Sequence, residues 1–297
     1  MASKRIEILE RYNELKRPLI LDGAMGSLLQ ERGAVNDKFL WLSKTNVDNP
    51  KLVEALHKEY IDSGADIITT NTFRTNPVSL KRSGYEIDQK HFVKESVRVA
   101  IEAKQDKKII IAGSNAPAED CYQKERTITK YELDYNHKKH IELLWESGCD
   151  IIWNETQSHW DEIEIICRFC SNNNLPFAIN LYFGNNLKLL SGEPLHEAVE
   201  FIKDFGLNSI GFNCIRPEMF SKYFGSNEMP KHWGFYFNCG LGNVTDESIV
   251  CGITPSYYIK SIGKFATEKP LFIGSCCGSS PLHTKAIKEY VDEVYRN

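Results

Sequence analysis

The strongest constraint on the fold is a repeated unit in which a helix ends at a glycine and a short apolar strand follows. Three copies are clear, with glycine and strand at Gly64 and 66–71, Gly148 and 150–155, and Gly206 and 209–214. Glycine suits these helix ends because it accepts the left-handed backbone conformation of a C-terminal stop. In each copy the strand ends on a side chain that can bind a ligand: Asn71, Glu155 or Cys214.

The rest of the chain continues this alternation. Five more apolar segments predict strands, at 18–22, 108–113, 176–182, 232–237 and 270–274, and helical patterns follow them up to a last helix at 281–296. Eight strand–helix units predict a (β/α)8 TIM barrel. No linker interrupts the series, so we expect a single domain over residues 1–297. Two polar loops, 114–131 and 239–253, are expected to lie over the barrel mouth.

The N-terminal segment predicts an additional helix. Residues 3–16 place Ile6, Leu9, Tyr12 and Leu15 at helical spacing. This segment precedes the first strand, so we expect a helix that caps the barrel.

Composition limits the possible partners and the compartment. The chain has 297 residues, 42% of them hydrophobic, and a formal net charge of -4, as expected for a globular protein that binds neither nucleic acid nor an anionic membrane surface. No apolar run has the length of a signal core or a membrane span. Its nine cysteines therefore indicate reduced thiols in the cytoplasm. The sequence does not decide between a monomer and a homo-oligomer.

Two adjacent cysteines follow the last strand. Cys276 and Cys277 stand between Gly274 and Gly278, so both can reach one centre only from the turn beyond the strand. A catalytic zinc ion takes three protein ligands and keeps one position open. Cys214, at the end of the sixth strand, is the best third ligand. The alternative is that all three are buried structural thiols.

Two acidic residues also end strands. Asp22 follows the first strand and Glu155 ends the fourth. Chemistry in such barrels gathers at the C-terminal ends of the strands, where both would lie. Asp22 has a second interpretation as the N-cap of the next helix, whereas Glu155 is a poorer N-cap type.

At these positions the chain resembles the zinc-dependent homocysteine S-methyltransferases. The resemblance covers nearly the whole chain and is carried by five segments: 21–29 (LDGAMGSLL), 64–73 (GADIITTNTF), 148–156 (GCDIIWNET), 211–214 (GFNC) and 274–278 (GSCCG). It implies a (β/α)8 barrel with zinc held by Cys214, Cys276 and Cys277. It also implies that homocysteine, which accepts the methyl group to become methionine, is held near Asp22, Gly23 and Glu155.

The methyl donor is less constrained. A cationic donor can be held by aromatic faces, for which Trp41, Phe73 and Trp153 are candidates, although Trp153 is equally compatible with a core position. Family members that use betaine look to carry a tyrosine directly after the glutamate of the fourth strand. This chain has Thr156 at that position. The segment around Trp41 resembles the branch that uses S-methylmethionine or S-adenosylmethionine. We therefore expect a methylsulfonium donor, with betaine as the alternative.

Two other classes of protein remain open. One is a catalytically silent relative that binds zinc and an amino acid. Intact Asp22 and Glu155 argue against it. The other is a zinc hydrolase on the same barrel, which would need histidine or carboxylate ligands and an activated water. The eight histidines form no cluster at the strand ends, so the cysteine pattern favours methyl transfer.

Overall fold

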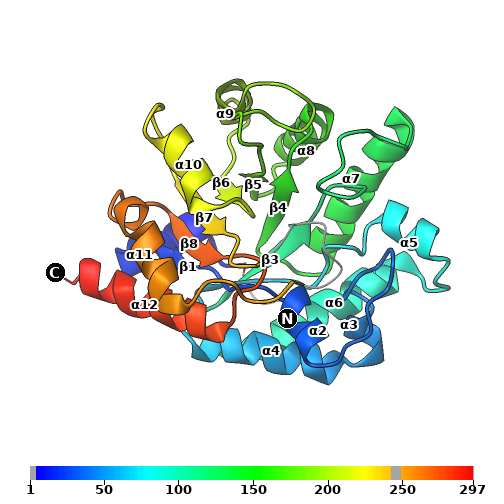
Figure 1. Cartoon of the computed structure of the whole chain (residues 1–297). Coiled ribbons are helices and arrows are strands. Elements are labelled where there is room, and N and C mark those ends of the chain that lie inside the picture. Colours follow the sequence, from blue (N-terminus) through cyan, green and yellow to red (C-terminus); the bar gives the residue numbers. More distant parts are fainter. Residues whose placement is uncertain (1–4, 242–248, 297) are drawn as a thin grey trace.

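A computed structural model describes residues 5–241 and 249–296, and it contains a barrel of parallel strands surrounded by helices (Figure 1). The strands pair in the order β1-β8-β7-β6-β5-β4-β3-β2, and a bridge between Leu21 and Ile67 joins the two ends of this series. The predicted (β/α)8 barrel is therefore confirmed. The strands are β1 (Leu19–Ile20), β2 (Ile67–Thr69), β3 (Ile110–Asn115), β4 (Ile151–Gln157), β5 (Phe177–Leu181), β6 (Ser209–Asn213), β7 (Trp233–Phe237) and β8 (Phe272–Ser275).

Helices cover the outside of the barrel, and their ends follow local sequence signals. Helix α4 begins where the Asn49 side chain accepts the Leu52 N–H ahead of Pro50. Helix α7 begins at Lys130, where Thr129 and Glu132 form a capping box. The helices are α1 (Ile8–Leu15), α2 (Gly26–Glu31), α3 (Thr45–Asp48), α4 (Pro50–Asp62), α5 (Pro77–Ser83), α6 (Gln89–Lys104), α7 (Lys130–Glu146), α8 (Trp160–Asn172), α9 (Leu195–Lys203), α10 (Pro217–Phe224), α11 (Pro255–Ala266) and α12 (Pro281–Val294).

Helix α1 closes the N-terminal end of the barrel, as predicted. Ile8 is buried with the first residues of the strands, among them Leu19 and Ile67. The backbone N–H of Ile6 donates to Asp150, directly before β4, at 2.8 Å. This end is therefore filled by apolar side chains and paired polar groups, which leaves the opposite end for chemistry.

Aromatic side chains fill the middle of the barrel. The rings of Trp153 and Phe272 meet edge to face at 4.8 Å, and the indole N–H of Trp153 donates to the Tyr236 hydroxyl at 3.3 Å. Gly234 makes room for this layer, because a Cβ there would lie 2.4 Å from the Phe272 ring. Trp153 is fully buried, so the core interpretation of this residue is the correct one.

Both long loops reach the C-terminal end of the barrel. The loop after β3 places Ala118–Gln123 along a cavity there, and Ile249 of the second loop lines the same cavity. The backbone N–H of Cys239 also donates to the carbonyl of Cys277 at 2.8 Å, which fastens the second loop to the turn after β8. Residues 242–248 of that loop lie outside the described residues. Within the described ranges, no helix has the length and apolar character needed to cross a membrane.

Candidate active site

One cavity at the C-terminal end of the barrel is lined by all of the residues that the sequence nominated except Trp153. Its volume is about 980 Å³. Residues from seven different strand–helix units line it, so the barrel itself brings them together. The nominated residues on its wall are Asp22, Gly23, Trp41, Phe73, Glu155, Cys214, Cys276 and Cys277.

The three cysteines form one compact cluster. The sulfur of Cys277 lies 3.6 Å from that of Cys214 and 3.9 Å from that of Cys276, and all three sulfur atoms lie within 4.8 Å of one another. The turn after β8 needs glycine at position 278, where φ is +76° and a Cβ would lie 2.6 Å from the Cα of Gly240. The cluster is close enough to bind a single metal ion.

Cys214 and Cys276 are joined by a disulfide bond. The sequence predicted nine reduced thiols, and this prediction is wrong for that pair. The physical reason is that β6 and β8, which flank β7, end at the same mouth and direct the two sulfur atoms at each other. A metal ion would use the same sulfur atoms, so metal binding requires this bond to be reduced.

The third thiol of the cluster is not acidic by itself. Burial raises the pKa of Cys277 to about 11, and the nearby Glu155 carboxylate raises it further. At neutral pH the free thiol is therefore protonated. A bound cation would reverse this, because coordination removes the thiol proton.

Asp22 is not a helix cap. Helix α2 begins at Gly26 and its N-cap position is Met25. The Asp22 carboxylate instead accepts the Thr69 backbone N–H at 2.8 Å and the Thr69 hydroxyl at 3.2 Å. Burial raises its pKa well above the ordinary value, and the charge of Glu155 raises it further.

Glu155 faces the same cavity from β4. Its carboxylate accepts hydrogen bonds from the Ser114 hydroxyl and, at 3.2 Å, from the Tyr236 hydroxyl. Burial raises its pKa to about 7, although both hydrogen bonds oppose the shift. Within residues 5–241 and 249–296, neither Glu155 nor Asp22 has a basic side chain within ion-pair distance. Two neighbouring carboxylates without a cation favour a positively charged ligand.

The aromatic pair lies elsewhere on the cavity wall. Trp41 and Phe73 meet edge to face with ring centroids 6.1 Å apart. Gly26 makes room for the indole, since a Cβ there would lie 2.2 Å from the Trp41 ring. Gly23 is equally confined, because its Cβ would lie 2.5 Å from the Ser279 hydroxyl oxygen. Its backbone can therefore approach a ligand closely.

Three residues on the cavity wall have a strained backbone. Trp41, Thr156 and Cys214 all have positive φ, at 49°, 59° and 54°, which non-glycine residues rarely adopt. Thr156 is held there by Asn213, whose side-chain oxygen accepts the Thr156 N–H at 3.0 Å and whose amide donates to the Thr156 hydroxyl at 2.9 Å. The surrounding structure thus imposes unusual conformations where the ligand-binding groups lie.

Several cavity residues were missed from the sequence. Ser114 and Tyr236 bind Glu155, and Ser279 accepts the Ala24 N–H at 3.0 Å. Tyr122 and Arg74 also line the cavity. Alternation along β7 could have directed Tyr236 inward together with Gly234, but choosing which strand face points inward requires the barrel register.

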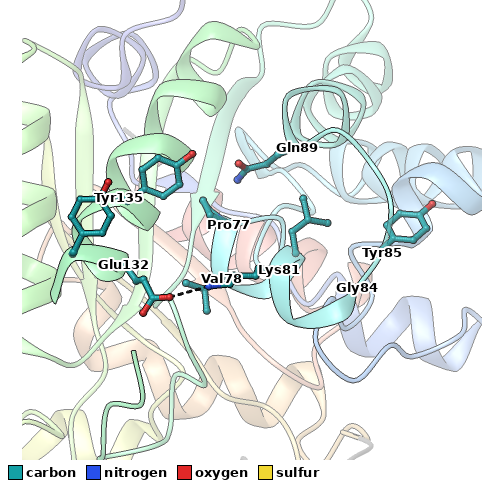
Figure 2. Close-up of a pocket in the computed structure, with 10 residues that line it drawn as sticks. Pro77, Val78, Lys81, Gly84, Tyr85, Gln89, Glu132 and Tyr135 are labelled. Carbon is teal, nitrogen blue, oxygen red and sulfur yellow. Dashed lines mark hydrogen bonds and ion pairs between the residues drawn. The ribbon is translucent and has the colours of Figure 1, made fainter. Parts of the chain in front are cut away.

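A second hollow lies on the outer surface, between α5 and α7 (Figure 2). It has a volume of about 530 Å³ and exposes Tyr131 and Tyr135. Its acid, Glu132, pairs with Lys81 at 3.1 Å and also caps α7. This surface hollow contains none of the nominated residues, so the barrel mouth is the candidate site.

Known proteins resemble this chain in sequence and in fold. Residues 19–291 match the family model described as homocysteine S-methyltransferase. A homocysteine S-methyltransferase of Escherichia coli (strain K12) is 28% identical, and the match covers 67% of this chain and 70% of that protein. Homocysteine S-methyltransferase 2 of Zea mays is 22% identical, and the match covers 91% of this chain and 88% of that protein. The metallated form of the homocysteine methyltransferase MmuM from Escherichia coli superposes with a TM-score of 0.79 at 23% identity, covering 95% of this chain and 99% of MmuM.

Proposed function

The chain belongs to the homocysteine S-methyltransferase family, and on that premise we propose that it methylates homocysteine to methionine with a methylsulfonium donor, S-methylmethionine or S-adenosylmethionine. One observation carries the proposal. Three clustered sulfur atoms line a single cavity at the barrel mouth, together with two carboxylates that have no basic partner among residues 5–241 and 249–296.

We assign zinc to Cys214, Cys276 and Cys277 after reduction of the disulfide. Thiolates about 2.3 Å from a tetrahedral zinc ion lie roughly 3.8 Å from one another. The Cys277 sulfur lies 3.6 and 3.9 Å from the other two, which fits this ion. The Cys214 and Cys276 sulfur atoms have to move apart once their bond is reduced. When bound, zinc would take the homocysteine sulfur as its fourth ligand and keep it deprotonated and nucleophilic at neutral pH.

The two acids then hold the amino end of homocysteine. An ammonium group beside Glu155, with Asp22 assisting, would supply the cation that both carboxylates lack. It would also favour the ionised form of Glu155, whose pKa burial raises to about 7. The substrate carboxylate would meet backbone N–H groups of the turn at Gly23.

The donor binds against Trp41 and Phe73, whose faces suit a cationic methylsulfonium. A lone pair of the homocysteine sulfur forms the new bond to the methyl carbon, and the electron pair of the old carbon–sulfur bond stays on the donor. The donor leaves as a neutral thioether. No side chain has to give it a proton, so the protein contributes alignment and close approach.

Thr156 favours the sulfonium donor over betaine. A tyrosine at this position would offer its face to a quaternary ammonium. The threonine hydroxyl is instead engaged by the Asn213 amide at 2.9 Å. Because the site requires reduced cysteines, a reducing compartment such as the cytoplasm is the setting that we propose.

Competition between donors tests the proposal. The reduced, zinc-loaded protein is given homocysteine with equal S-methylmethionine, S-adenosylmethionine and betaine, and each spent donor is measured. A heavy isotope in the carbon chain of S-methylmethionine separates its product from methionine made from homocysteine. We expect labelled methionine to dominate. Dimethylglycine as the main by-product would establish the betaine alternative, and no methionine from any donor would establish a catalytically silent relative.

A further inference from the structure

Arg74 is a partly buried cation on the cavity wall, and it has no acidic partner in the parts of the chain that the structure describes. Arg74 follows Phe73 in the segment between β2 and α5 and is partly buried at the cavity. Its guanidinium donates to the backbone carbonyl of Glu119 at 2.5 Å, and its central carbon lies 5.2 Å from the Phe73 ring centroid. No carboxylate of residues 5–241 or 249–296 pairs with it.

Two other cations near the cavity, Arg82 and Lys38, differ from Arg74 in how their charge is stabilised. Arg82, at the same cavity, pairs with Glu119 at 2.6 Å and is therefore neutralised by the protein. Lys38 is exposed to solvent, where water hydrates its charge, and its ammonium lies 5.2 Å from the ring centroid of Phe39. A partly buried guanidinium without an acid keeps unused donors that match a carboxylate.

We propose that Arg74 binds the carboxylate of an amino-acid sulfonium donor, next to the aromatic pair that holds its sulfonium. This deepens the proposed function and rests on it. The inner acids Asp22 and Glu155 would take the ammonium of homocysteine, while Arg74 takes the anionic end of the other substrate.

The spacing supports this division. In an extended amino-acid sulfonium, four ordinary covalent bonds separate the sulfur from the carboxylate carbon, a span of roughly 5 Å. The Arg74 guanidinium lies at a similar distance, 5.2 Å, from the Phe73 ring centroid. The hydrogen bond to the Glu119 carbonyl fixes one terminal nitrogen of the guanidinium and leaves the other nitrogens to bind the ligand.

The test compares S-methylmethionine with its carboxamide, which has the same shape without the negative charge. In the wild type, kcat/KM should be about ten- to a hundredfold higher for the acid, as expected for a charge-assisted hydrogen bond. Arg74→Met should remove this preference by lowering kcat/KM for the acid alone, with the KM of homocysteine unchanged. Arg74→Lys should restore part of it. Lys38→Met is the matched control and should keep the wild-type preference.

Three outcomes would overturn the inference. Equal losses for both donors in Arg74→Met would mean that Arg74 only supports the loop at Glu119. A wild type that does not prefer the acid would mean that no cation binds the donor carboxylate. A raised KM for homocysteine in Arg74→Met would place Arg74 in the homocysteine site. Calorimetric binding of the same two compounds gives the same comparison without turnover. A protein that transfers no methyl group therefore contradicts the proposed function, whereas the binding preference still decides the role of Arg74.

Discussion

Each end of the barrel holds a pair of acids, Asp66 and Asp150 at one end and Asp22 and Glu155 at the other, and the partners of the two pairs differ. At the end closed by α1, Asp66 accepts the Arg17 guanidinium at 2.7 Å and the Ile20 N–H at 2.9 Å. Asp150 accepts the backbone N–H groups of Ile6 and Ile111, each at 2.8 Å. Both carboxylates join chain segments that are distant in sequence, and the protein itself satisfies them.

The two acids at the mouth have no basic partner among the described residues. Among the residues that the structure describes, Asp22 is bound only through Thr69, and Glu155 only through two hydroxyl groups. Burial raises the pKa of both side chains. The acids at the closed end are therefore structural, because Arg17 or backbone N–H groups bind their carboxylates. The carboxylates at the mouth are instead suited to a positively charged ligand.

The largest expected effect is the loss of the metal. Cys214→Ala, Cys276→Ala or Cys277→Ala should each abolish zinc binding and methyl transfer while circular dichroism shows a folded barrel, because two thiolates rarely hold the ion. The exposed Cys251 gives the matched control, and Cys251→Ala should keep one zinc per chain. Full metal content in Cys214→Ala would refute the three-cysteine site.

Removing the charge of Glu155 should have the next largest effect. A charged hydrogen bond to the ammonium of homocysteine is worth roughly 1.5–3 kcal/mol. Glu155→Gln should therefore weaken homocysteine binding by about ten- to a hundredfold in calorimetry and leave zinc in place. Unchanged affinity would make Glu155 a structural acid like those at the closed end.

Lowering the pH should weaken homocysteine binding in the same way as Glu155→Gln, although by less. Since the pKa of Glu155 is raised to about 7, the carboxylate becomes protonated below that pH, while the homocysteine ammonium stays charged. Deprotonation of the homocysteine thiol makes its affinity depend on pH in the wild type and in Glu155→Gln alike. Titration of Glu155 should add a further fall of about fivefold in the wild type as the pH drops from 7 to 6. Zinc content is measured at each pH. An equally steep profile in Glu155→Gln would assign the extra titration to another group.

The smallest effect on binding is expected at the closed end. Asp150→Asn keeps one hydrogen-bonding oxygen but loses the charge that two backbone N–H groups share. We expect a loss of about 1–3 kcal/mol in the free energy of unfolding, measured with urea, and an unchanged homocysteine affinity. A weaker homocysteine affinity at full zinc content would remove the distinction between the two ends.

The sequence predicted what depends on local pattern. Glycine stops such as Gly64 and the apolar strands repeat along the chain, so the barrel and the strand-end position of Glu155 followed from periodicity. Cys276 and Cys277 were identified because an adjacent pair in a turn is chemically unusual. These features are encoded within a few residues of where they act.

What the sequence left undecided depends on contacts across the barrel. Whether Asp22 caps a helix or faces the cavity depends on Thr69, which belongs to another strand. The hydroxyl of Tyr236 reaches Glu155 only because β4 and β7 face each other across the interior. The Cys214–Cys276 bond likewise reflects the packing of strand ends, which one segment alone cannot specify.

The coordination of the metal tests the central claim most directly. The reduced protein is loaded with zinc, and X-ray absorption at the zinc edge is measured before and after homocysteine is added. We predict one zinc per chain with three sulfur ligands, and four once homocysteine binds. A sulfur count that does not change with homocysteine, or a reduced protein that binds no zinc, would contradict the claim that the barrel mouth is a metal site completed by its substrate.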